Sequence, residues 1–285
     1  MTTPSGSLPN ETRLGRTALR TADRAELVAF YRDVVGLDVL SESGSTTSLG
    51  VDETVLVVVI SDEDARPRDR REAGLFHTAF RVPGRAALGD ALARIRDRWR
   101  LEGASDHGFS EALYLSDPDG NGVEIYRDRP RAEWPRADDG SYVAPSEPLD
   151  LDGIAAEVAT EAASTAPPET DVGHVHLEVS SIDAARAFYV EALGFDAMIT
   201  NGSSMLFVSA GGYHHHVGLN TWKGRTQSIA DDSRGLAWFE VVVPDAAVAT
   251  IRERLESEEL RETDDERGFA VADPDGIGVR IVSGE

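Results

Sequence analysis

The stretch SEALYLSDPDGNGVEIY, residues 110–126, has the pattern of a β-hairpin. Apolar residues alternate in both arms, and the DPDG segment at 117–120 places proline and glycine where a tight turn accepts them. Glu124 lies between Val123 and Ile125, so it occupies the opposite face of its strand. On a solvated face Glu124 is an ordinary surface residue, which is the commoner case for a lone carboxylate. On a face that lines a closed cavity it needs a partner such as a metal ion.

Two internal similarities show that the chain repeats itself. LGRTAL at 14–19 matches VGHVHL at 172–177, and DPDGNGVEI at 117–125 matches DPDGIGVRI at 273–281. In each half the first segment precedes a helical pattern, whereas the second has the alternation of a strand. The sequence therefore predicts four units, each with a strand, a helix and three short strands. Units one to four cover residues 13–61, 74–128, 172–221 and 234–283.

These units divide the chain into two halves. We predict a disordered start at 1–12, a first domain at 13–128, a linker at 129–171 and a second domain at 172–285. The linker is rich in proline and charge, and a short helix is predicted over 149–163. With 285 residues, the chain is long enough for two domains that each bury a core.

The composition is strongly acidic. The formal net charge is −23, and of the 28 basic residues only Lys223 is a lysine. This charge argues against nucleic acid and anionic membranes as partners. We interpret the acidic excess and the use of arginine as a halophilic adaptation that keeps the protein dissolved in high salt. Cysteine is absent, which excludes disulfides and gives no indication of the compartment. No apolar run approaches a membrane span and residues 1–12 do not resemble a signal peptide, so we expect a soluble, cytoplasmic protein, with a homo-oligomer left open.

Two of the seven histidines occupy equivalent places in different units. His77 in LFHTAF and His174 in GHVHLEV each lie five residues before a strand-ending valine. A lone histidine is more often a satisfied core residue than a ligand. Two imidazoles together with Glu124, however, form the ligand set of a non-haem Fe(II) site with three open positions, whereas a closed zinc site requires four protein ligands. We therefore predict these three residues as metal ligands. The equivalent positions in the other two units hold Arg16, Trp238 and Arg280.

The run YHHH at 213–216 is predicted to begin the last strand of unit three. Alternation along a strand places His214 and His216 on one face and His215 on the other. At least one of these histidines is therefore expected to face the same side of the sheet as the predicted metal ligands. The alternative interpretation is a polar entrance to the strand without a role in the site.

Three further side chains are candidates for contacts near the metal. His176 points the same way as His174 along its strand and is predicted to contact the substrate or a ligand. Tyr114 lies on the hairpin arm antiparallel to Glu124, and His107 precedes that hairpin. Phenol and imidazole groups can exchange protons near neutral pH, so both are candidates for proton transfer.

Together these features resemble the vicinal oxygen chelate superfamily, which contains glyoxalases, bleomycin resistance proteins and extradiol dioxygenases. Within it, SEALYLSDPDGNGVEIY at 110–126 and SAGGYHHHVGLN at 209–220 are similar to catechol 2,3-dioxygenases of the bacterial CatE type. The resemblance implies an α+β fold in which four βαβββ units form two cup-shaped mixed sheets flanked by helices. In many two-domain extradiol enzymes the ligands come from units three and four. Here unit four lacks them, so the active cup must join units two and three, and units one and four must pair.

The resemblance implies extradiol ring cleavage of catechol or a substituted catechol by O2, a step of aromatic-compound catabolism. The diol binds Fe(II), with Mn(II) as the alternative metal, and the product is a muconic semialdehyde. The metal is held by His77, His174 and Glu124. A histidine of the 214–216 run is the acid–base group, with His216 preferred over His215. The other side chains expected to contact the diol or its oxyanion are Tyr114, His107, His176 and His214.

Two other functions are compatible with this fold. A glyoxalase-like, metal-dependent lyase or isomerase usually recruits a second glutamate as a fourth ligand. Here that position falls in the run at 214–216, which contains no carboxylate, so the oxygenase is favoured. A metal-free resistance protein that binds an aromatic compound has no use for the two histidines and the glutamate. Metal content distinguishes it from both enzymes.

Overall fold

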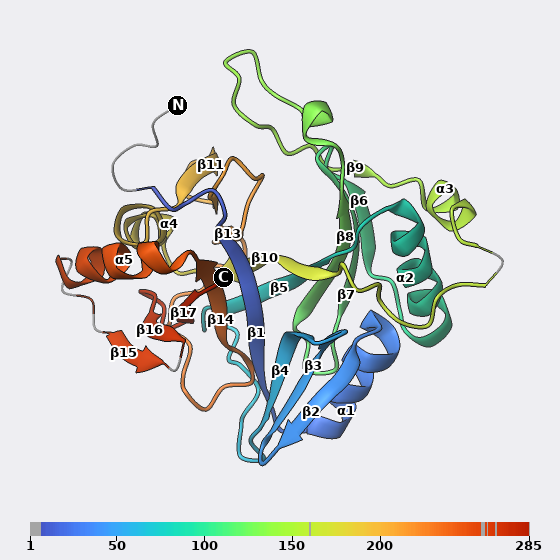
Figure 1. Ribbon diagram of the computed structural model, residues 1–285, viewed down its shortest axis with the longest axis horizontal. Helices are drawn as coiled ribbons and strands as arrows, with labels where there is room; N and C mark the ends of the chain where they lie inside the picture. The colour runs from blue at the N-terminus through green and yellow to red at the C-terminus, as the bar shows by residue number, and fades with distance from the viewer. Residues whose placement is uncertain (1–6, 160, 258–259, 261, 266, 285) are drawn as a thin grey trace.

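The computed structural model contains two β-sheets, with the helices at the periphery of the molecule (Figure 1). It describes residues 7–159, 161–257, 260, 262–265 and 267–284. Unit one consists of β1 (Arg13–Thr21), α1 (Arg24–Phe30), a π-helical turn η1 (Tyr31–Val35), β2 (Asp38–Ser43), β3 (Thr46–Val51) and β4 (Thr54–Ser61). Unit two consists of β5 (Gly74–Arg81), α2 (Arg85–Arg98), β6 (Gly103–Asp106), β7 (Ser110–Ser116) and β8 (Gly122–Asp128).

The second half repeats this order of elements. Unit three consists of β10 (Asp171–Glu178), α4 (Ile182–Arg186), a π-helical turn η3 (Ala187–Ala192), β11 (Asp196–Asn201), β12 (Met205–Ser209) and β13 (Val217–Asn220). Unit four consists of β14 (Gly235–Val243), α5 (Asp245–Ser257), β15 (Glu262–Asp265), β16 (Gly268–Ala272) and β17 (Gly278–Ser283). The predicted α+β architecture of four βαβββ units is confirmed.

The units pair across the two halves of the chain. One sheet has eight strands in the order β15-β16-β17-β14-β1-β4-β3-β2, which joins unit four to unit one. The other has nine strands in the order β11-β12-β13-β10-β5-β8-β7-β6-β9, which joins unit three to unit two. The prediction that units two and three share one sheet is therefore confirmed. Each half of the sequence contributes one unit to each sheet.

The DPDG turn is formed by the same contacts in both halves. Asp117 accepts the backbone N–H of Asn121 at 2.9 Å, and Gly120 has a φ of 82° that a side chain would disfavour. Asp273 accepts the N–H of Ile277 at 2.9 Å in the repeat. Aspartate and glycine are therefore retained in both turns because each supplies a contact or a conformation that the hairpin requires.

The connection between the halves is longer and more structured than a simple linker. It contains a short 3₁₀ helix (Arg131–Glu133), β9 (Glu147–Pro148) and α3 (Leu151–Ala156). The strand β9 extends the nine-stranded sheet beside β6, and α3 is the short helix that the sequence predicts. The connection therefore contributes to the sheet that joins units two and three.

The predicted disordered start does not hold for residues 7–12. The backbone N–H of Leu8 donates to the carbonyl of Gly194 at 2.7 Å, and the Leu8 side chain is 2% exposed. Burial of this leucine outweighs the polar composition around it. Residues 1–6, the rest of that prediction, lie outside the described part of the chain.

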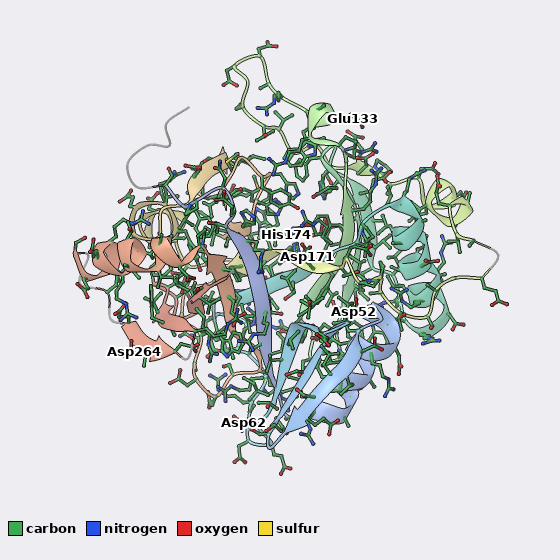
Figure 2. All side chains as sticks on the ribbon, viewed as in Figure 1. Asp52, Asp62, Glu133, Asp171, His174 and Asp264 are labelled. Atoms are coloured by element: carbon green, nitrogen blue, oxygen red, sulfur yellow. The ribbon has the colours of Figure 1, made fainter. Side chains whose placement is uncertain are left out.

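Several acidic side chains lie at the edge of the molecule. Figure 2 shows Asp62, Glu133 and Asp264 at the periphery, whereas His174 lies near the centre. No helix among the described residues is long and apolar enough to cross a membrane.

Gly122 provides a test of the close contact between β5 and β8. A methyl group on Gly122 would overlap the carbonyl oxygen of Phe76 and lie 2.9 Å from Cβ of His77. We expect Gly122→Ala to destabilise the protein by about 1–3 kcal/mol, because the strands must move apart. Gly84→Ala is the matched control, since a methyl group on Gly84 meets no atom within 4 Å. Chemical denaturation of both variants checks this, and equal stabilities would contradict it.

Candidate metal centre

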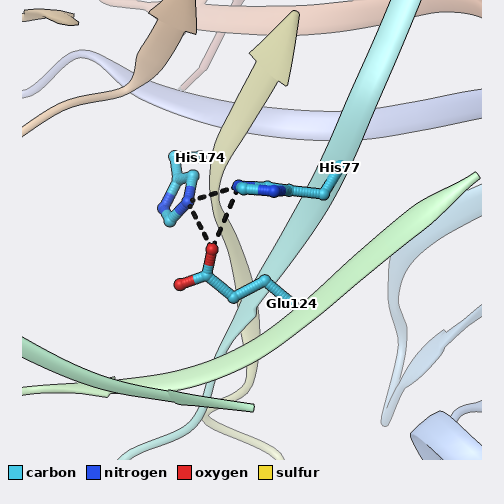
Figure 3. Close-up of side chains that lie close together, drawn as sticks. All are labelled: His77, Glu124 and His174. Atoms are coloured by element: carbon cyan, nitrogen blue, oxygen red, sulfur yellow. Dashed lines mark hydrogen bonds and ion pairs between the residues drawn. The ribbon is translucent and has the colours of Figure 1, made fainter. Parts of the chain in front are cut away.

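Three buried side chains converge on one point in the nine-stranded sheet (Figure 3). Nε2 of His77 on β5 lies 3.0 Å from Oε2 of Glu124 on β8, and Nε2 of His174 on β10 lies 3.2 Å from the same oxygen. The two Nε2 atoms are 3.3 Å apart. The three side chains are at most 6% exposed. The sequence predicts that these three residues surround one site, and the structure shows that they do so within one chain.

The register of the strands explains this convergence. Ala79 on β5 pairs with His174 on β10 and with Glu124 on β8, so these three residues form a row across the sheet. His77 lies two residues before Ala79 and therefore shares its face. The small side chain of Ala79 leaves space above the strand, which the two longer side chains on either side enter.

The chemistry of this donor set fits a divalent metal ion. Burial alone would raise the pKa of Glu124, but His174 and His77 hold it well below its usual range. Burial lowers the pKa of His174 to about 4, so its imidazole is neutral and offers a lone pair. A buried carboxylate requires a compensating charge, which a cation at the common centre supplies. The residues therefore form a buried His–Glu–His metal site.

One feature departs from the usual surroundings of a metal-binding histidine. Such a histidine normally donates its second ring N–H to a carboxylate or a carbonyl. Nδ1 of His174 has no hydrogen-bond partner among the described residues. Its ring is held by packing instead, with its centroid 4.1 Å from that of His215 and 4.9 Å from that of Tyr126.

The triad lies on the wall of a cavity of about 540 Å³. This volume is in the range of small-molecule sites in proteins. Besides the triad, the wall contains apolar and aromatic side chains, which include Phe76, Met205, Phe207 and Trp222. The cavity therefore offers polar ligands for a diol and apolar surface for the rest of an aromatic molecule.

Tyr114 and His107 both line this cavity, as expected of substrate contacts. The Tyr114 hydroxyl lies 2.9 Å from Nε2 of His107, and Nδ1 of His107 lies 2.8 Å from the carbonyl of Pro145. Burial and the neighbouring Glu124 raise the pKa of Tyr114 well above its usual value, so the phenol keeps its proton. Sequence reasoning missed Pro145, because it treated the connection as a linker and found no motif in it.

The run at 213–216 does not follow the predicted alternation. β13 begins only at Val217, so the histidines lie on a turn before the strand. His215 lines the cavity, with its ring stacked on Phe207 at a centroid distance of 4.3 Å. The expectation that His216 faces the cup is wrong. Nδ1 of His216 lies 3.2 Å from the N–H of Ala210, and its ring does not line the cavity.

His214 also differs from its predicted place. It lies behind His215, outside the cavity lining, and contacts Asp128 through Nε2 at 3.0 Å. His176 does line the cavity, with its ring centroid 4.9 Å from that of His77. Nε2 of His176 is buried and has no hydrogen-bond partner among the described residues, so it is available to a bound molecule.

The other sheet brings together the equivalent residues, as predicted. The guanidinium Cζ of Arg280 lies 3.7 Å from the ring centroid of Trp238, and that of Arg16 lies 5.7 Å from it. Arg16 also forms an ion pair with Glu240 at 2.5 Å, and Arg280 pairs with Asp265 at 3.3 Å. In this sheet ion pairs and ring stacking occupy the place of the metal triad.

Comparison with known proteins agrees with this arrangement. The model of the Glyoxalase/Bleomycin resistance protein/Dioxygenase superfamily matches residues 13–125 and 171–281. A catechol-2,3-dioxygenase of Bacillus subtilis is 38% identical over 274 residues, which cover 94% of this chain and 96% of that protein. Biphenyl-2,3-diol 1,2-dioxygenase 3 of Rhodococcus globerulus is 32% identical over 120 residues, which cover 41% of this chain and 63% of that protein.

The fold is also found among solved structures. Glyoxalase I from Zea mays superposes with a TM-score of 0.59 at 15% identity, covering 96% of this chain and 92% of that chain. At this identity the likeness concerns the fold alone. The repeated units, the two matched ranges and the full-length relative lead to one conclusion: the chain belongs to the Glyoxalase/Bleomycin resistance protein/Dioxygenase superfamily.

Proposed function

We propose that this protein is an extradiol dioxygenase that cleaves catechol or a substituted catechol with Fe(II) and O2. The observation that carries this proposal is the buried triad of two histidines and one glutamate at the wall of a cavity. Three protein ligands leave positions open for a diol and for O2. The full-length similarity to a catechol-2,3-dioxygenase supports the same reaction.

When bound, Fe(II) supplies one centre at which the diol and O2 react, so that both oxygen atoms enter the ring-opened product. The chain itself binds and orients the diol and moves its protons. His215 faces the cavity and is the acid–base group for the diol hydroxyl. Tyr114 and His107 form a second hydrogen-bonded pair that can hold the other diol oxygen. His176 contributes a buried, unpaired nitrogen to the same cavity.

The lyase alternative is less well supported by the cavity. Such a site needs a second carboxylate beside the metal, and Glu124 is the only carboxylate among the described residues that line the cavity. His215 occupies the wall where that ligand would be required. Activity on a thiol hemiacetal without O2 uptake on any catechol would favour the lyase. A chain that binds aromatic compounds but no metal would be a resistance protein.

Removal of the metal site is the first test. We expect Glu124→Gln to reduce bound iron from about one ion per chain to a trace, because the anionic ligand is lost. O2 uptake with catechol should disappear with the iron. Glu102→Gln, which removes a largely exposed carboxylate outside the cavity, should retain both. Iron analysis and an oxygen electrode measure these outcomes, and full activity of Glu124→Gln would contradict the proposal.

The histidine run gives a second test, since neighbouring residues have different surroundings. We expect His215→Ala to lower kcat by about 10²-fold or more while iron content is unchanged, because it removes an acid–base group and no ligand. His216→Ala should change kcat little, because His216 does not reach the cavity. The reverse pattern would show that the acid–base group is His216.

The apolar part of the cavity predicts the preferred ring substituent. Among the described residues that line the cavity, none is lysine or arginine, and Lys223 beside Trp222 is already bound by Glu178 at 3.0 Å. A carboxylate on the ring would be buried without a partner. We therefore expect alkyl- or aryl-substituted catechols to exceed 3,4-dihydroxybenzoate in kcat/KM by at least about tenfold, roughly 1.4 kcal/mol.

Trp222→Ala should lower kcat/KM for the alkyl- or aryl-substituted catechol but not for unsubstituted catechol. Equal kcat/KM for the carboxylated and apolar substrates would contradict this assignment of the cavity.

A further inference from the structure

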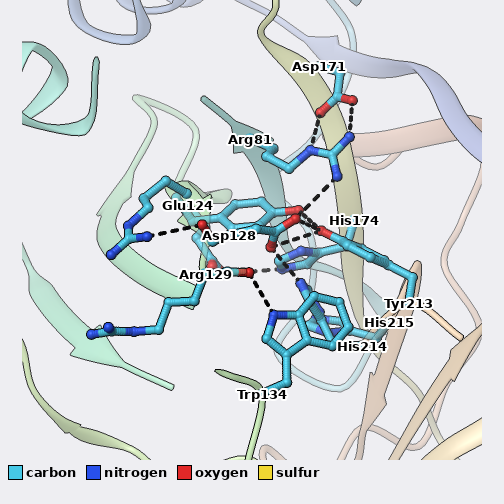
Figure 4. Close-up of polar contacts among 12 residues, drawn as sticks. Arg81, Glu124, Asp128, Arg129, Trp134, Asp171, His174, Tyr213, His214 and His215 are labelled. Carbon is cyan, nitrogen blue, oxygen red and sulfur yellow. Dashed lines mark hydrogen bonds and ion pairs between the residues drawn. The ribbon is translucent and has the colours of Figure 1, made fainter. Parts of the chain in front are cut away.

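A row of three hydrogen-bonded side chains lies behind the cavity wall (Figure 4). Oδ1 of Asp128 lies 3.0 Å from Nε2 of His214, and Nδ1 of His214 lies 2.7 Å from Nδ1 of His215. His214 is fully buried, and His215 is 5% exposed and lines the cavity. The row therefore runs from a carboxylate at the end of β8, through one buried imidazole, to the imidazole that lines the cavity.

Asp128 is an ionised acceptor in this row. Burial would raise its pKa, but His214 and Arg81 hold it below its usual value. Arg81 donates to Oδ2 at 3.2 Å, and the Tyr213 hydroxyl donates to the same oxygen at 3.0 Å. An ionised carboxylate can only accept hydrogen bonds. The proton between Asp128 and His214 therefore belongs to Nε2 of His214.

The direction of the next hydrogen bond follows from this proton. His214 is fully buried against the ring of Phe109, and the charge of Asp128 is already paired with Arg81 at 3.2 Å, so the imidazole is neutral and carries one proton. Burial lowers the pKa of His214 in the same sense. Because that proton is on Nε2, Nδ1 has a lone pair and accepts a hydrogen bond. The donor is Nδ1 of His215, 2.7 Å away. His215 then carries its proton on Nδ1, and its Nε2 has the free lone pair.

Aromatic packing holds both rings in the planes that these hydrogen bonds require. Phe109 stacks on His214 with a centroid distance of 4.4 Å and an interplanar angle of 17°, and Trp134 meets its edge at 5.3 Å. Phe207 stacks on His215 at 4.3 Å, also with an angle of 17°. A flip of the His214 ring would replace both ring nitrogens by carbons and break both bonds, so one orientation is strongly favoured.

We propose that Asp128 and His214 are positioning residues that hold His215 as its Nδ1–H tautomer, with the Nε2 lone pair directed at the substrate. The inference rests on the proposed function for its substrate, a diol. In the first proton transfer, the O–H bond of the diol breaks and its electron pair stays on oxygen. A new N–H bond forms at Nε2 of His215. The charge that appears on this imidazole is stabilised by the anionic Asp128 through His214.

The tautomer is measured directly by ¹⁵N NMR of the full chain labelled at histidine. The diamagnetic Zn(II)-loaded protein is used, and the His215 signals are assigned by comparison with His215→Gln. We expect a protonated Nδ1 and an unprotonated Nε2 on His215. A protonated Nε2 on His215 in the wild-type protein would overturn the proposal.

Asp128→Asn should reverse the donor and the acceptor in both hydrogen bonds of the row. The amide oxygen is expected to face Arg81 and Tyr213, so the amide N–H₂ faces His214 and donates to its Nε2. His214 must then donate from Nδ1, which moves the proton of His215 to Nε2. In the iron-loaded enzyme kcat should fall by about 10²-fold or more with little change in KM. Thermal unfolding checks that the variant is folded.

Two further variants separate positioning from structural effects. His214→Phe keeps an aromatic ring packed against Phe109 and Trp134 but removes the hydrogen-bond acceptor for His215. We therefore expect kcat to fall again while iron is retained. Tyr142→Phe is the control, because the Tyr142 hydroxyl donates to the carbonyl of Gly212 at 3.2 Å and contacts no member of the row, so kcat should stay within about threefold of the wild-type value.

Unchanged kcat in both Asp128→Asn and His214→Phe would overturn the proposal even if the wild-type enzyme is active. If iron-loaded wild-type protein cleaves no catechol, the proposed function fails. The ¹⁵N spectra then decide the tautomer of His215 independently.

Discussion

The antiparallel pairing of β5 with β10 is the interaction on which the rest of the site depends. These strands come from different halves of the chain, and their register places Ala79 between His174 and Glu124. A slip of one residue would turn His174 to the opposite face of the sheet. Because β5 also pairs with β8, one strand sets the positions of all three metal ligands.

Buried charged side chains are compensated differently in the two sheets. In the sheet of units two and three, Glu124 is buried beside His77 and His174 and needs a cation. At the equivalent place in the other sheet, Arg16 pairs with Glu240, and Arg280 stacks on Trp238. Duplication of the fold therefore preserves the geometry of both cups, while the side chains decide which one can bind a metal.

The connection at 129–171 has two structural roles. It carries the chain from unit two to unit three, so that both can join one sheet, and it also completes the cavity. The carbonyl of Pro145 contacts His107, and Trp134 packs against the edge of His214. Both groups of proton-bearing side chains therefore depend on a segment that belongs to neither repeat. Loops of this kind often carry function because a rigid scaffold positions them.

The amino-acid sequence by itself determined the four units, their pairing and the three metal ligands. Strand alternation and the internal repeat both have a fixed period, so the face of Glu124 and the equivalence of His77 and His174 follow from position alone. The orientation of residues 213–216 was decided by tertiary structure, because they lie before β13 and alternation does not apply there. Stacking on Phe207 turns His215 into the cavity. The contact between Asp128 and His214 likewise joins residues 86 positions apart, and no periodic pattern links them.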